Sequence, residues 1–106
     1  MNALDGIVTH LDGTAVVTMC GEIDAASTPT FFALVDQAVN AAPHVVFDMR
    51  DVWFMDSSGL AVFEYATREQ QRRGGTITVR QPSRAVMRTM EITGLDRLVM
   101  VDAFVD

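Results

Sequence analysis

The stretch "HVVFDMRDVWFMDSSGLAVF", from His44 to Phe63, joins a strand-like run to a helix-like run. Its first part, His44 to Met49, is mostly β-branched and aromatic, as in a short buried strand. From Ser57 onward, apolar residues recur every three or four positions as far as Ala66, which is helical spacing. We therefore expect a strand, a short loop and a helix, with Ser57 and Ser58 at the start of the helix.

Strand and helix patterns precede this unit. Residues 6–21, "GIVTHLDGTAVVTMCG", alternate imperfectly between apolar and polar on either side of Asp12-Gly13, a dipeptide suited to a tight hairpin turn. Ser27 or Thr28 can then cap a helix that runs from about Pro29 to Ala41. The apolar residues of this helix recur at helical spacing: Phe32, Val35 and Val39.

The pattern continues after the serines. Gly74-Gly75 ends the second helix, and "TITVR", Thr76 to Arg80, is typical of a strand. Ser83 can cap a third helix that Gly94 closes, and residues 97–104, "RLVMVDAF", can supply a last short strand. Because strands that alternate with helices imply right-handed crossovers, the sequence predicts one α/β domain over residues 1–106. Its sheet should be mixed and mostly parallel, opened by a β-hairpin, with three or more helices.

Composition limits the possible functions. With 106 residues, 49% of them hydrophobic, the chain suits one modest core, and its apolar runs are shorter than the roughly 20 residues that span a bilayer. The N-terminus has no pattern of a signal peptide, so we expect a cytoplasmic protein. The one cysteine, Cys20, is interpreted as a small apolar strand residue, because Cys20, His10 and His44 lack the close spacing of a metal site.

The charge is unevenly distributed. The net charge of −6 argues against nucleic acid or an anionic membrane as the main partner, since both attract concentrated positive charge. Residues 1–56 contain eight acids and one arginine, a balance of −7, whereas residues 57–106 contain six acids and seven arginines, a balance of +1. The acidic excess lies in the half that leads to the serines and favours a basic partner surface there.

Three roles are open to the serines. A helix cap would satisfy an unpaired N–H at the helix start, for roughly 1 kcal/mol. A catalytic serine would need a base, and His44 begins the preceding strand, roughly 20 Å from that strand's far end. No G-x-S-x-G elbow or S-x-x-K lysine is present, which argues against a serine hydrolase. A phosphoacceptor is the third role, since a helix N-terminus accommodates a phosphate whose charge then alters the surface.

Several motifs together resemble one family. "FMDSSGLAVF" looks like the phosphorylation-site signature of the STAS-domain anti-sigma factor antagonists of bacteria. "GEIDAAST" resembles the Gly-Glu-[Ile/Leu]-Asp loop of that family, "RRGGTITV" its helix end and next strand, and "VMRTMEITGLDRLVMV" its third helix and Gly-Leu turn. The resemblance spans nearly the whole chain in one order.

The resemblance implies a regulator of transcription that is not itself an enzyme. In that family the unphosphorylated protein binds an anti-sigma factor, itself a serine kinase, and so frees the sigma factor. The kinase then phosphorylates the antagonist and releases it, and a phosphatase resets the cycle. By position, the acceptor here is Ser57. The partner-binding residues implied are Glu22, Asp24, Met55, Asp56, Ser58 and Gly59.

Further expectations follow for partners and structure. ATP would belong to the kinase, because this chain has no glycine-rich phosphate loop with a lysine, and we expect no cofactor or metal. We expect a monomer or weak dimer. Trp53 and Phe54 are predicted to pack in the core, with the alternative that Trp53 is exposed and serves as an interface anchor. Glu22 and Asp24 have the alternative role of a solvated loop in which Asp24 prepares the helix that follows. The main rival function is a STAS-like adaptor, for instance in a transport or lipid-trafficking complex, with no phosphoswitch at Ser57.

Overall fold

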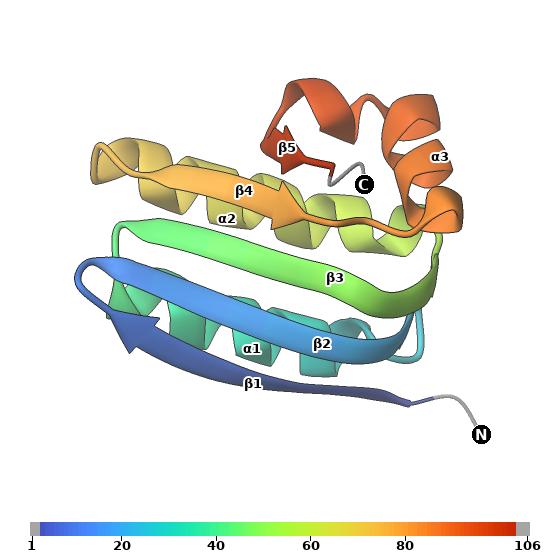
Figure 1. Ribbon diagram of the computed structural model, residues 1–106, viewed down its shortest axis with the longest axis horizontal. Coiled ribbons are helices and arrows are strands. Elements are labelled where there is room, and N and C mark those ends of the chain that lie inside the picture. The colour runs from blue at the N-terminus through green and yellow to red at the C-terminus, as the bar shows by residue number, and fades with distance from the viewer. Residues whose placement is uncertain (1–2, 104–106) are drawn as a thin grey trace.

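The computed structural model describes residues 3–103, which form one five-stranded sheet with its helices. The strands lie in chain order, β1-β2-β3-β4-β5; β1 is antiparallel to β2 and each later pair is parallel (Figure 1). This confirms the predicted α/β fold with a mixed sheet opened by a hairpin. The elements are β1 (Leu4–Leu11), β2 (Thr14–Ile23), α1 (Thr28–Ala41), β3 (His44–Met55), α2 (Leu60–Arg72), β4 (Thr76–Arg80), α3 (Arg84–Thr93) and β5 (Met100–Asp102).

Local signals set several of the boundaries. Asp12 and Gly13 have φ angles of 54° and 81°, as a two-residue hairpin turn between β1 and β2 requires. The Ser83 hydroxyl accepts a hydrogen bond from the Val86 N–H at the start of α3, and Gly94 ends that helix with a φ of 80°. The predicted turn and both predicted ends of the third helix are therefore confirmed.

The centre of the core is a cluster of three phenylalanines from different elements. Phe31 of α1, Phe47 of β3 and Phe63 of α2 are fully buried and meet edge to face, with ring centroids 5.1–6.2 Å apart. Each such pair adds roughly 0.5–1.5 kcal/mol beyond the burial of its area. The cluster fixes α1 and α2 on the same face of the sheet (Figure 1).

Phe31 corrects the predicted apolar set of the first helix. Phe32 is 42% exposed, and its ring lies 4.9 Å from the ring of Tyr65 on the outer side of the helix pair. Both phenylalanines fit helical spacing with Val35, so the spacing alone did not distinguish them. Phe31 takes the core position because it meets Phe47 and Phe63.

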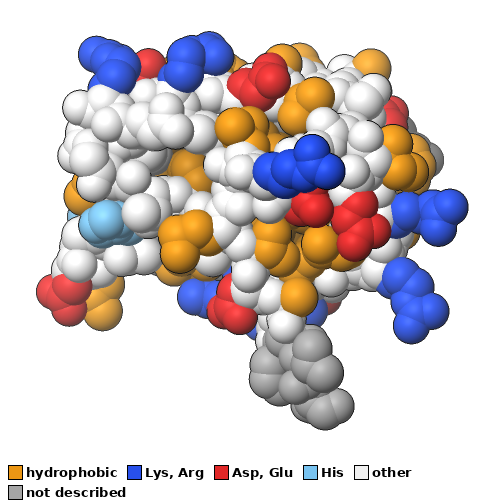
Figure 2. Space-filling model, turned by 90° about the horizontal axis from the view of Figure 1, so that it is seen from above, with side chains coloured by type: hydrophobic (Ala, Val, Ile, Leu, Met, Phe, Trp, Pro, Cys, Tyr) orange, Lys and Arg blue, Asp and Glu red, His pale blue; other side chains and the backbone are white. Residues whose placement is uncertain are grey.

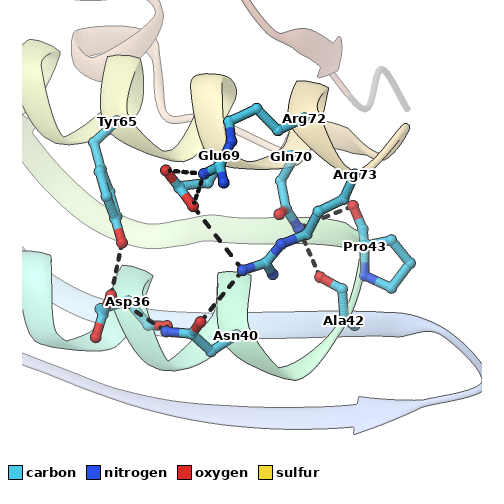
Figure 3. A network of polar contacts seen from close by, with 9 residues as sticks. All are labelled: Asp36, Asn40, Ala42, Pro43, Tyr65, Glu69, Gln70, Arg72 and Arg73. Carbon is cyan, nitrogen blue, oxygen red and sulfur yellow. Dashed lines mark hydrogen bonds and ion pairs between the residues drawn. The ribbon is translucent and has the colours of Figure 1, made fainter.

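A polar network joins α1 and α2 on their outer side (Figure 3). The Tyr65 hydroxyl donates to Asp36 Oδ1 at 2.7 Å, and Arg73 donates to Asn40 Oδ1 at 3.3 Å. Deeper in, Gln70 is 1% exposed and donates from Nε2 to two carbonyl oxygens of the loop between α1 and β3, those of Ala42 and Pro43. These bonds tie α2 to α1 and to the start of β3.

Two further features concern the helices and the surface charge. No helix within residues 3–103 has the length and apolar character needed to cross a membrane. The face seen in Figure 2, viewed from above Figure 1, carries arginines scattered among hydrophobic and acidic side chains. That face therefore lacks the concentrated positive charge that nucleic acid attracts.

Candidate functional site

The serines lie in a tight turn between β3 and α2. The Asp56 N–H donates to the carbonyl oxygen of Ile23 at 3.1 Å, which continues the β2–β3 pairing up to the turn. Ser57–Gly59 then form a single 3-10 turn, and α2 begins at Leu60. The helix thus begins three residues later than predicted, and β3 extends to Met55 instead of ending near Met49.

Asp56, and not a serine, caps this turn. Its carboxylate accepts a hydrogen bond from the Ser58 N–H at 2.8 Å and another from the Ser58 hydroxyl. Ser58 is half-buried, and its hydroxyl is held by Asp56. This arrangement gives the N–H of Ser58, at the start of the turn, a hydrogen-bond acceptor, as a helix cap does.

Ser57 is in a different environment from Ser58. Its side chain is exposed, and its hydroxyl has no hydrogen-bond partner among the residues that the structure describes. Of the two adjacent hydroxyls, the first is thus accessible from solvent and the second is engaged within the turn.

Buried residues fix the turn from below. Met55 is 3% exposed, and its carbonyl oxygen accepts a bond from the Thr89 hydroxyl of α3 at 2.7 Å. A Cβ atom on Gly59 would lie 2.9 Å from Ile23 Cγ2, so packing inside the domain explains this glycine. The burial corrects the expectation that Met55 contributes to a partner surface: its side chain belongs to the core.

Asp24 lies in the loop between β2 and α1. Its Oδ1 accepts a bond from the Ser27 N–H at 3.0 Å, and its own N–H donates to the Ser27 hydroxyl at 2.9 Å. Its carbonyl oxygen accepts a bond from the Thr28 hydroxyl at 2.8 Å. These bonds give Asp24 the role of shaping the start of α1, the alternative that the sequence left open.

Glu22 contacts an aromatic side chain that the sequence placed in the core. Trp53 Nε1 donates to Glu22 Oε2 at 3.0 Å across the β2–β3 pair. Trp53 is 58% exposed and Phe54 43% exposed, so the prediction that they pack in the core was wrong.

The reason is irregular strand pairing. The β2–β3 register shifts twice, between Thr18 and Cys20 and again between Gly21 and Glu22. Each shift breaks the alternation of faces along a strand. Val52 and Met55 consequently point into the core while Trp53 and Phe54, consecutive in the chain, both point outward. The exposed Trp53 is the alternative that the sequence left open; the sequence alone does not decide it, because bulges depend on the pairing between strands.

The two histidines are remote from the serines. His44 begins β3 and pairs with Thr14 of β2, whereas Met55, next to the turn, pairs with Ile23 at the other end of the same strands. The His44 ring is engaged with the Thr76 hydroxyl at 2.9 Å, and His10 pairs with Ala15 beside the hairpin turn. A serine–histidine pair for nucleophilic catalysis is therefore absent from residues 3–103.

In the described part of the chain, no cluster of histidine, cysteine and acidic side chains is arranged to hold a metal ion. Cys20 lies on β2, as predicted, but its side chain is exposed. The chemistry available at the site is therefore that of an exposed hydroxyl beside a carboxylate.

Comparison with known proteins identifies the class. The family model of the STAS domain matches residues 7–106, so the chain belongs to the STAS domain family. It is 32% identical over 96 residues to the anti-sigma-F factor antagonist RsfA of Mycobacterium tuberculosis, and the matched region covers 88% of this chain and 75% of that protein. It is 29% identical over 87 residues to the anti-sigma-B factor antagonist of Bacillus subtilis, covering 82% of this chain and 80% of that one.

A solved structure of an anti-sigma factor antagonist has the same fold. The anti-sigma factor antagonist from Mycobacterium paratuberculosis matches with a TM-score of 0.84 and 27% identity, over 97% of this chain and 88% of the other. The resemblance noted in the sequence is thus confirmed for the whole fold. All three relatives are named as antagonists of anti-sigma factors, and none of these names describes an enzyme.

Proposed function

We propose that this protein is an anti-sigma factor antagonist that is switched off by phosphorylation at Ser57. In its unphosphorylated form it binds an anti-sigma factor that is also a serine kinase, and so frees a sigma factor for transcription in the cytoplasm. The relatives' names support the partner class. The observation that carries the switch is the contrast between the exposed, unbonded hydroxyl of Ser57 and the hydroxyl of Ser58, which is held by Asp56.

The turn suits a modification that leaves the fold unchanged. Because Ser57 is exposed and its hydroxyl makes no hydrogen bond within residues 3–103, a phosphate there displaces nothing from the described core. Phosphate adds about −1.5 to −2 charges next to the Asp56 carboxylate, directly after the acidic half of the chain. The electrostatic change is therefore concentrated at the surface that the partner would contact.

The size of that change is sufficient for a switch. Repulsion between two unit charges about 4 Å apart, at an effective dielectric constant near 20, is on the order of 4 kcal/mol. This corresponds to roughly a thousandfold loss of affinity for a partner with an acidic group facing Ser57. The kinase binds the ATP, and a separate phosphatase removes the phosphate from Ser57. The antagonist itself is a monomer or weak dimer of one domain and needs no cofactor.

The test is phosphate mapping. Each serine-kinase anti-sigma factor of the source organism is incubated with ATP and the wild-type protein, Ser57→Ala or Ser58→Ala, and the products are mapped by mass spectrometry. We expect one kinase to modify the wild type and Ser58→Ala on Ser57, and to leave Ser57→Ala unmodified. Stable binding of a kinase without any phosphate on Ser57 would contradict the switch and favour the adaptor function.

A further inference from the structure

The bulged end of β3 exposes two aromatic side chains just before the turn that contains Ser57 and Ser58. Trp53 is 58% exposed and Phe54 43% exposed, and they are followed by the buried Met55 and then by Asp56 and Ser57. Because β3 is held here on one side by the Asp56–Ile23 bond and on the other by the bond from Thr89 to Met55, the aromatic pair is mounted on rigid backbone. Exposed aromatics near the centre of a binding surface are typical energetic hot spots.

Glu22 restricts the orientation of the Trp53 indole. The 3.0 Å bond from Trp53 Nε1 to the half-buried Glu22 carboxylate satisfies the one polar atom of the side chain while its rings stay in solvent. A side chain that is already oriented loses less conformational entropy when a partner covers it. The bond therefore gives Glu22 a role as a hydrogen-bond acceptor that does not require direct contact with a partner.

The charged residues that adjoin the aromatic pair along β3 are acidic. Asp51 is exposed two residues before Trp53, and Asp56 is half-buried two residues after Phe54. Arg50, the one base in residues 1–56, is engaged with Asp48 at 3.1 Å. A complementary surface therefore combines an apolar pocket with arginine or lysine on the side that faces Asp51, away from the acidic group that faces Ser57 in the proposed switch.

We propose that Trp53, oriented by Glu22, and Phe54 form an aromatic anchor that enters an apolar, basic-rimmed pocket on the anti-sigma factor. This inference rests on the proposed function and adds a second contact to it. Glu22 is a positioning residue, and Trp53 makes the contact. Trp53 and Phe54 lie four and three residues before Ser57 in the chain, so the anchor stabilises the same complex that phosphorylation of Ser57 weakens.

Trp53 is the single tryptophan of the chain, so its fluorescence reports directly on the anchor. The probe is the kinase that modifies Ser57, with its own tryptophans replaced by phenylalanine. We expect the emission of Trp53 to shift to shorter wavelength and its quenching by acrylamide to fall several-fold when this kinase binds. Unchanged emission and quenching in a complex that forms would overturn the anchor.

The contribution of the aromatic anchor to the Kd is measured by calorimetry on variants. We expect Trp53→Ala to weaken binding at least about thirtyfold, the scale of a hot spot. Glu22→Gln keeps an acceptor for the indole N–H and should stay within about threefold of wild type, whereas Glu22→Ala should weaken binding more than Glu22→Gln does. Leu11→Ala is the matched control, because Leu11 is 75% exposed beside the hairpin turn, at the opposite end of the sheet.

The outcomes separate this inference from the proposed function. If the wild type binds the kinase and Trp53→Ala binds within threefold of it, the anchor is wrong and the antagonist function stands. If the wild type sediments as a dimer and Trp53→Ala as a monomer, the aromatic pair contacts a second copy, which also overturns the anchor. If no kinase binds the wild type, the proposed function fails and the anchor fails with it. Equal midpoints of thermal unfolding confirm that the variants are folded.

Discussion

The hydroxyl of Ser58 donates a hydrogen bond to the carboxylate of Asp56, two residues earlier, and the same carboxylate accepts from the Ser58 N–H. This pair closes the turn that presents Ser57. Because both bonds end on one carboxylate, Asp56 determines the local stability of the turn, while Ser57 contributes little to it. The bonds that stabilise the turn thus belong to Asp56 and Ser58, and the proposed modification falls on Ser57, their neighbour in the same tripeptide.

We expect Asp56→Ala to lower the free energy of unfolding by about 1 kcal/mol, the usual loss when a cap is removed. Asp56→Asn keeps an oxygen acceptor for the Ser58 N–H and should lie closer to wild type. Urea unfolding of the three proteins measures the difference. Equal losses in Asp56→Ala and Asp56→Asn would show that the charge of Asp56, and not its capping bonds, stabilises the turn.

Gly59→Ala should destabilise the domain by about 1–3 kcal/mol, the usual cost of overpacking a core. The backbone of Gly59 is in the right-handed helical region, so the penalty comes from the new Cβ, 2.9 Å from Ile23 Cγ2. Thermal or urea unfolding measures it. Ser57→Ala, at an exposed site in the same turn, is the control and should change stability by less than about 0.5 kcal/mol. A Gly59→Ala protein as stable as this control would show that the turn relaxes freely.

Gln70→Ala should lower the free energy of unfolding by about 1–3 kcal/mol, because it leaves the Ala42 carbonyl oxygen, 2.7 Å from Gln70 Nε2, without its side-chain donor in a buried place. Gln71→Ala is the matched control, since Gln71 is the next residue of α2 and is exposed. It should lie within about 0.5 kcal/mol of wild type. Similar urea midpoints for the two variants would contradict the role of Gln70 in joining α2 to the start of β3.

Tyr65 should titrate above the usual pKa of a tyrosine, about 10. The hydrogen bond that its hydroxyl donates to Asp36 raises the pKa, as do desolvation and the nearby charge of Asp36. Since the folded-state pKa exceeds the unfolded one, the bond's contribution to stability is complete below about pH 10 and is lost as the pH rises through the folded-state pKa.

Tyr65 is the only tyrosine, so the ultraviolet absorbance of tyrosinate follows it alone. The titration midpoint should be higher in the folded protein than in urea, and higher in wild type than in Asp36→Asn. A folded-state midpoint at or below the midpoint in urea would contradict the bond. Stability measured against Tyr65→Phe should show a difference that shrinks as the pH rises through the folded-state pKa of Tyr65.

The elements that could be predicted are those with local causes. The Asp12-Gly13 turn needs positive φ angles, and the Ser83 cap and the Gly94 end each depend on a few neighbouring residues, so the sequence contains the required information. The position of Ser57 at a strand exit was predictable for the same reason: a buried strand followed by a helical pattern leaves the residues between them at the surface.

The misplaced residues depend on contacts between elements. Trp53 and Phe54 are large and apolar, which favours burial, but two register shifts between β2 and β3 turn them outward. The same pairing buries Met55 beneath the serine turn. Phe31 and Phe32 fit helical spacing equally well, and only the positions of Phe47 and Phe63 decide between them. Such outcomes require the tertiary arrangement.

The most direct test of the phosphoswitch compares the Kd of the anti-sigma factor for unphosphorylated and Ser57-phosphorylated protein, each purified to homogeneity and measured by calorimetry at the same ionic strength. We predict that phosphorylation weakens binding by at least tenfold and by as much as about a thousandfold, with the unfolding midpoint of the free protein nearly unchanged. Equal affinities of the two forms would contradict the account.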